Sequence, residues 1–132
     1  MSENFSIEIV NPEKSFLSKD EVSEVVVPAF EGEIGILKDH ISIISFLKPG
    51  IIKVFSGPEE EKYFVEDGIV EFKDNSLSIL TSSIFNIKDA DKNYISNTIS
   101  EAEKELTRDE IDDQKRFLLN HKIEVLKSLS FN

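Results

Sequence analysis

The 132-residue chain contains no cysteine and no tryptophan. Without cysteine it has no disulfide framework, no thiolate nucleophile and no zinc site built on sulfur, and an intracellular setting fits. Its two histidines, His40 and His121, stand far apart and form no spacing typical of metal ligands. We therefore expect neither a metal nor a metal-dependent reaction.

Basic residues are scarce, with 15 Lys and Arg against 26 Asp and Glu and a net charge of −11. Nucleic acids and anionic membrane surfaces attract basic patches, so this balance disfavours both as partners. No apolar stretch reaches the roughly 18–20 residues of a membrane-spanning helix. The first ten residues, MSENFSIEIV, lack the basic and apolar regions of a secretory signal. We expect any membrane association to depend on a protein partner.

Glycine and proline are missing from the chain after Gly68, since all five Gly and all four Pro lie at or before that residue. In the first half, short apolar runs such as Phe5-x-Ile7-x-Ile9 and Val25-Val26-Val27 alternate with turn signals. Pro28 is expected to end its strand because it cannot donate to a sheet ladder. This pattern predicts a flattened β-sandwich or barrel of about ten short strands over residues 1–86.

A helical pattern begins near Asp89 and predicts a second domain over residues 87–132. Thr107-Arg108-Asp109-Glu110 has the form of a capping box, so a second helix is expected to start directly after the first. Two helices with a short joint form an antiparallel hairpin. The residues expected to pack it recur at helical spacing or every seven residues: Ile95, Ile99, Ala102, Leu106, Leu118 and Val125.

The sequence contains no residue pattern typical of a catalytic site. Glu31 and Glu33 flank a single glycine on a predicted loop tip, which is not the geometry of an acid and base facing each other across a cleft. The spacing of Gly32 and Gly35 is not that of a phosphate-binding loop, and no Ser lies in a nucleophile elbow. The residues alone indicate a binding or regulatory module.

Several ordered segments carry a family resemblance: VPAFEGEIGIL at 27–37, FLKPGIIKV at 46–54, YFVEDGIVEF at 63–72, LSIL at 77–80 and AEKEL at 102–106. Together they resemble the epsilon subunit of the rotary F-type ATP synthase over nearly the whole chain. The resemblance implies a sandwich that binds the rotor subunit gamma and loops that touch the membrane c-ring. Carried over by motif, the c-ring contacts would be Glu31, Gly32, Glu33 and His40. The alternatives are a solvated acidic tip and a structural histidine.

The resemblance also gives the helical hairpin a regulatory role, because in that family it can extend into the catalytic hexamer and block ATP hydrolysis. Its basic residues would then meet an acidic segment of the beta subunit. The candidates here are Lys115, Arg116, Lys122 and Lys127, and the alternative is an ordinary solvated helix face.

Some members of that family bind ATP through an aspartate and an arginine at the start of the first C-terminal helix. Here Asp91 is kept, but Tyr94 stands in place of the arginine, whose guanidinium is the group suited to phosphate. We expect weak or no ATP binding and no cofactor.

The resemblance thus implies a non-catalytic subunit that couples gamma to the c-ring in proton-driven ATP synthesis. Its partners would be gamma, the c-ring and the catalytic alpha and beta subunits. It would sit peripherally on the cytoplasmic face of the bacterial inner membrane, held there by the complex. Two alternatives stay open, namely a free-standing β-sandwich adaptor and an ATP-sensing regulatory protein.

Overall fold

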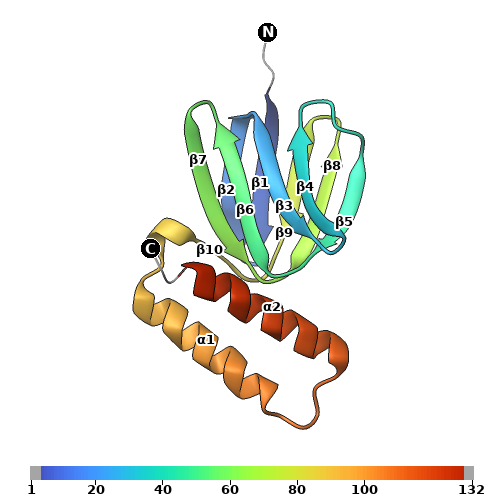
Figure 1. Ribbon diagram of the computed structural model, residues 1–132. Coiled ribbons are helices and arrows are strands. Elements are labelled where there is room, and N and C mark those ends of the chain that lie inside the picture. The colour runs from blue at the N-terminus through green and yellow to red at the C-terminus, as the bar shows by residue number, and fades with distance from the viewer. Residues whose placement is uncertain (1–3, 130–132) are drawn as a thin grey trace. The chain divides into compact units, whose positions relative to one another are not determined.

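The computed structural model describes residues 4–129 and divides the chain into two compact units between Ile87 and Lys88. The first unit consists of β-strands and the second of a helical hairpin (Figure 1). The strands are β1 (Phe5–Asn11), β2 (Lys14–Val22), β3 (Glu24–Ala29), β4 (Gly32–Leu37), β5 (Ile43–Leu47), β6 (Gly50–Ser56), β7 (Glu59–Val65), β8 (Gly68–Lys73), β9 (Ser76–Leu80) and β10 (Ile84–Asn86). A 3-10 turn, η1 (Ile87–Asp89), precedes the helices α1 (Lys92–Leu106) and α2 (Asp113–Leu129). The predicted fold class, a β-sandwich followed by two helices, is confirmed.

The strands form one hydrogen-bonded sheet in the order β10-β7-β6-β3-β5-β8-β9-β1-β2, with β4 paired to β3 beside this path. The sheet folds over itself, so that β7, β6, β3 and β4 form one layer and β8, β9, β1 and β2 the other (Figure 1). β5 joins the layers, because it pairs with β3 at one residue, Ala29 to Leu47, and with β8 along its whole length. β1 and β9 run parallel, and the other pairs are antiparallel.

Alternation of side chains builds the core between the layers. Phe5, Ile7 and Ile9 on β1 are buried, as are Val25 and Val27 on β3. Because successive side chains of a strand point to opposite faces, these residues enter one continuous cluster. Buried β-branched side chains suit this pleated surface.

The strand expected to end at Pro28 continues to Ala29. Pro28 cannot donate a backbone hydrogen bond, but its carbonyl oxygen accepts one from the Lys48 amide at 3.0 Å. Its ring also lies against Gly50, where an added Cβ would come within 2.5 Å of the Pro28 Cβ. Proline is tolerated here because its remaining polar group is paired and a glycine makes room for its ring.

The second unit is held by an apolar cluster between its two helices. Ala102, Leu119 and Ile123 are buried in it, and three half-buried residues pack against them: Ile99, Leu106 and Ile111. Ile95 is also buried. Leu118 and Val125, expected from their seven-residue spacing, are half-buried and lie outside this cluster. The buried residues of α2 are instead Leu119, Ile123 and Leu126, which follow each other at spacings of four and three.

The expectation that Thr107 starts the second helix is wrong. Thr107 is the C-cap of α1, and its hydroxyl donates to the Lys104 carbonyl oxygen at 2.6 Å. The second helix starts after Asp112, whose carboxylate accepts from the Lys115 amide at 2.7 Å. Asp112 therefore satisfies an amide that the first turn of a helix leaves unpaired.

Candidate functional site

An apolar patch on the outer surface of the sheet is the most distinctive feature of the first unit. Phe46 on β5 pairs directly with Ile69 on β8, and Ile69 pairs with Leu80 on β9. Their side chains are 64%, 38% and 50% exposed. Directly opposed residues on one face of a sheet touch, so these three form a continuous apolar row.

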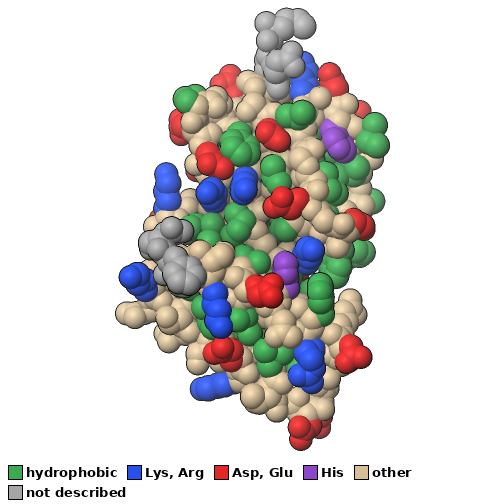
Figure 2. Space-filling model, viewed as in Figure 1, with side chains coloured by type: hydrophobic (Ala, Val, Ile, Leu, Met, Phe, Trp, Pro, Cys, Tyr) green, Lys and Arg blue, Asp and Glu red, His purple; other side chains and the backbone are tan. Residues whose placement is uncertain are grey.

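Two further residues widen this row into what we call the β5–β8–β9 patch: Phe30, Ile44, Phe46, Ile69 and Leu80. Ile44 is 71% exposed and lies two residues from Phe46 on the same face of β5. Phe30 follows β3, and its amide donates to the Phe46 carbonyl oxygen at 3.0 Å. Figure 2 shows hydrophobic side chains gathered along the flank of the sheet where Figure 1 places β5.

The surface of the patch is hollowed in two places that meet at Phe46 and Ile69. One hollow, of about 450 Å³, is lined by Phe30, Leu47, Gly68 and Leu80 among others. The other, of about 370 Å³, is lined by Glu31, Ile44 and Ser45. An exposed apolar surface with hollows and a charged rim is typical of a protein–protein interaction site.

Glu31 supplies this charged rim. It lies in the turn between β3 and β4, and the Ser45 hydroxyl donates to its carboxylate at 3.2 Å. The Gly32 backbone has φ of +135°, a conformation that residues with a side chain rarely adopt. Glu33 is exposed and is the second residue of β4, where it pairs with Pro28. The acidic turn predicted from the sequence is thus fixed beside the apolar patch.

His40 does not lie with these residues. It follows β4, whereas Glu31 precedes it, and a six-residue strand at about 3.3 Å per residue separates the two by about 20 Å. The His40 ring meets the edge of the buried Phe72 ring at a centroid distance of 6.0 Å, and its Nδ1 lies 2.7 Å from the Ile41 carbonyl oxygen. The structure therefore does not bring the four proposed c-ring contacts together at one end of the sheet.

The loop that carries His40 is tied to the turn between β8 and β9. The Asp39 amide donates to the Asn75 side-chain oxygen at 2.7 Å, and the Asn75 amide group donates back to the Asp39 carboxylate at 2.9 Å. Asp39, Asp74 and Asn75 all have positive φ angles. These contacts support a structural role for the His40 loop.

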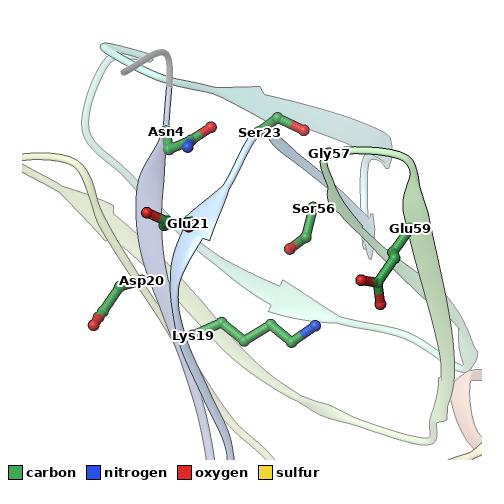
Figure 3. Close-up of a pocket in the computed structure, with 8 residues that line it drawn as sticks. All are labelled: Asn4, Lys19, Asp20, Glu21, Ser23, Ser56, Gly57 and Glu59. Atoms are coloured by element: carbon green, nitrogen blue, oxygen red, sulfur yellow. The ribbon is translucent and has the colours of Figure 1, made fainter. Parts of the chain in front are cut away.

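A polar pocket of about 690 Å³ lies at the end of the sheet that carries the β6–β7 turn, and Figure 3 shows the residues lining it. Lys19 extends from β2 across this pocket, and its amine is paired with the carboxylate of Glu61 on β7. Tyr63 also donates to Glu61, at 3.2 Å. Because the lysine is already paired, the pocket presents mainly carboxylates and hydroxyls, and we assign it no catalytic role.

The described residues offer no metal site, because no group of three His, Cys, Asp or Glu side chains among residues 4–129 is arranged to hold an ion. In the same part of the chain, no helix is long and apolar enough to cross a membrane.

In the hairpin, the basic residues of α2 and the residue Asp91 have contacts that bear on their predicted roles. Lys115 and Lys127 on α2 approach acidic residues of α1, with Lys115 Nζ 3.2 Å from Glu105 Oε2 and Lys127 Nζ 3.9 Å from Glu103 Oε2. Arg116 donates to the Leu106 carbonyl oxygen at 3.4 Å, and Lys122 is half-buried. Asp91 is the N-cap of α1 and accepts from the Tyr94 amide at 2.7 Å.

Comparison with known proteins decides the family. Residues 4–87 match the model of the ATP synthase delta/epsilon chain β-sandwich domain. The ATP synthase epsilon chain of Pelagibacter ubique (strain HTCC1062) is 68% identical over 130 residues, covering 98% of this chain and all of the relative. This chain belongs to the ATP synthase epsilon chain family.

More distant epsilon chains match over similar lengths. That of Mesorhizobium japonicum is 36% identical over 118 residues, covering 88% of this chain and 85% of the relative. That of Rhizobium etli (strain CIAT 652) is 33% identical over 122 residues, covering 92% and 89%. The resemblance to the family is therefore confirmed by relatives whose sequence match extends into the part of this chain that forms the hairpin.

Chains of two solved structures share the fold of this chain. One is a chain of the Euglena gracilis mitochondrial ATP synthase OSCP/F1/c-ring structure, with a TM-score of 0.73 at 21% identity over 99% of this chain and 81% of that one. The other belongs to the Tetrahymena thermophila mitochondrial ATP synthase central stalk and c-ring, with a TM-score of 0.67 at 13% identity over 98% of both chains. At these identities the likeness shows the fold.

Sequence reasoning missed the patch in this epsilon-family chain, although a signal was present. The segment Ile43-Ile44-Ser45-Phe46-Leu47 is apolar at four of five positions, so it cannot alternate between an apolar and a polar face. In the structure Leu47 is buried while Ile44 and Phe46 face outward. In an antiparallel sheet, a strand with apolar residues on both faces indicates that its outer face also packs against something, such as a partner protein.

Proposed function

We propose that this chain is the non-catalytic epsilon subunit of a rotary F-type ATP synthase, where it joins the gamma subunit to the c-ring during proton-driven ATP synthesis. The observation that carries the proposal is the 68% identity to an ATP synthase epsilon chain along nearly the whole of both chains. Membership of this family disfavours a free-standing adaptor or a separate ATP-sensing protein.

The β5–β8–β9 patch is proposed as the surface that binds gamma. Interfaces that stay assembled are more apolar than ordinary protein surface and are anchored by aromatic side chains. Phe30 and Phe46 supply such anchors, and Ile44, Ile69 and Leu80 surround them. Glu31 at the rim would fix orientation through charge more than add affinity.

The end of the β3–β4 hairpin that carries Glu31, Gly32 and Glu33 is proposed to face the c-ring. Its two carboxylates are exposed, and the Glu31 side chain is oriented by Ser45. His40 is left out of this proposal because it lies at the other end of β4 and its ring is engaged with Phe72 and Ile41.

The hairpin, residues 87–132, is proposed as the regulatory part, and residues 1–86 as the part that assembles with gamma and the c-ring. Lys115, Arg116, Lys122 and Lys127 are the residues proposed to reach an acidic segment of the beta subunit when the hairpin inhibits ATP hydrolysis. Four basic residues on a helix of a strongly acidic chain support this role.

ATP is not proposed as a tight ligand. The Asp91 carboxylate, the one group of the family's ATP motif that is kept, caps α1 by accepting from the Tyr94 amide. The chain is proposed to sit on the cytoplasmic face of the bacterial inner membrane, held there by its protein partners.

Reconstitution tests this function. The synthase lacking this chain, placed in sealed vesicles, is expected to hydrolyse ATP with little proton pumping, and added chain is expected to restore the coupling between them. Proton pumping is followed with a pH-sensitive dye beside phosphate release. Equal coupling with and without the chain would contradict the proposal.

A further inference from the structure

Three of the four basic residues proposed to inhibit hydrolysis are already engaged by α1 inside the hairpin. Lys115 pairs with Glu105, Lys127 approaches Glu103, and Arg116 donates to the last carbonyl group of α1 at Leu106. In each case the partner belongs to α1 and the base to α2. An outside carboxylate would therefore compete with an inside carboxylate for Lys115 and for Lys127.

We propose that Glu103 and Glu105 act as built-in competitors of the inhibitory contact. With the helices packed together, they occupy the two lysines that the acidic surface of the beta subunit needs. The inference rests on the proposed function, because it assumes that these bases take part in inhibition.

The exposed fraction of the paired side chains determines how strongly the glutamates compete for the lysines. The lysine side chains are 53% and 57% exposed, and the glutamates are 37% and 55% exposed. Exposed ion pairs of this kind change an equilibrium by about 1.4- to 5.4-fold each. Two pairs together would hold back the inhibitory contact by roughly two- to thirtyfold, and added salt would weaken that effect. Competition of this size modulates inhibition without abolishing it.

The test uses the full chain with Glu103→Gln and Glu105→Gln combined. The matched control combines Glu101→Gln and Glu110→Gln, which changes the net charge equally. Both control residues are exposed, and neither has an ion pair within residues 4–129. The concentration of chain that half-inhibits ATP hydrolysis by the catalytic complex is expected to fall about two- to thirtyfold for the first variant relative to the control.

A second background separates competition from a general charge effect. In a chain that already carries Lys115→Ala and Lys127→Ala, the Glu103→Gln and Glu105→Gln changes should no longer matter, because the bases they release are gone. An equal gain in inhibition in that background would overturn the proposal, as would equal inhibition by the variant and its control.

The proposed function and this inference fail in different ways. If the wild-type chain and a chain truncated after Leu106 inhibit equally, the hairpin is not inhibitory, and both the inhibitory role and this competition are wrong. If truncation relieves inhibition while the two paired variants inhibit alike, the hairpin inhibits but Glu103 and Glu105 do not compete.

Discussion

At the scale of single residues, Gly68 combines a positive φ angle with a close approach to another backbone atom. Its φ is +151°, and a Cβ added there would lie 2.6 Å from the Leu80 carbonyl oxygen. Gly32 has a similar φ of +135°, but nothing lies within 4 Å of its added Cβ. A side chain at Gly32 would therefore meet backbone strain alone, whereas one at Gly68 would meet both backbone strain and a steric clash.

We expect Gly32→Ala to lower the free energy of unfolding by about 1–3 kcal/mol through backbone strain alone. Gly68→Ala should lower it by a further 1–3 kcal/mol or so, because a backbone oxygen must move to admit the methyl group. Urea unfolding of the two variants measures the difference. Equal destabilisation would show that the close approach to Leu80 is relieved without cost.

Asp91 provides a second prediction at this scale. Asp91→Ala should destabilise the start of α1 by about 0.5–2 kcal/mol, because it removes the acceptor of the Tyr94 amide. Amide exchange in the first turn of α1 measures this. Asp89→Ala is the control, since Asp89 is exposed and lies in η1, before α1 begins. Calorimetry with ATP is expected to show no tight binding to the wild-type chain or to either variant.

The positions of Glu31 and His40 in the sheet could not be predicted from the sequence. Both carry a family motif, and the sequence places them nine positions apart. Only the strand between them, β4, puts them at opposite ends of the sheet. Their side-chain partners, Ser45 and Phe72, come from strands whose register cannot be read from local patterns.

At the scale of elements, α2 offers two adjacent leucines in different surroundings. Leu119 is buried between the helices, and Leu118 is half-buried outside that cluster. We expect Leu119→Ala to destabilise the hairpin by about 2–5 kcal/mol, as for other buried leucines, and Leu118→Ala to cost clearly less. Amide exchange over residues 92–129 is the measurement. A larger effect at Leu118 would mean that the seven-residue pattern marks the packed face after all.

The elements were predictable to different degrees. Alternation along Phe5, Ile7 and Ile9 and the run of valines at 25–27 mark strands that the structure contains. The end of α1 near Leu106 was also predictable, but the start of α2 was not, because Thr107 and Asp112 both head plausible caps. Which of two competing caps forms depends on the path of the connecting loop, and a local motif does not encode that path.

At the scale of the whole molecule, the division between Ile87 and Lys88 predicts a separable domain. We expect a chain ending at Ile87 to fold and to bind gamma as tightly as the full chain, because its core cluster is drawn from the first unit alone. Far-ultraviolet circular dichroism and a binding titration would check this. An unfolded spectrum would show that the sheet needs the hairpin.

The overall class followed from two changes in pattern, because glycine and proline cease after Gly68 and helical spacing begins near Asp89. The strand order did not, because the parallel pairing of β1 with β9 joins residues about seventy positions apart. Long-range pairing of this kind is decided by packing of the complete core, so the β5–β8–β9 patch could not be assembled from the sequence.

The central claim is that this chain binds gamma through the β5–β8–β9 patch, and calorimetry of the full chain with isolated gamma tests it most directly. Phe46→Glu should weaken binding by at least about thirtyfold, the effect of losing one central anchor. Leu37→Glu is the matched control, because Leu37 is a comparably exposed strand residue outside the patch, 56% against 64% exposed. It should leave the Kd within about twofold. Wild-type affinity in the Phe46→Glu chain, or no binding by the wild-type chain, would contradict the account.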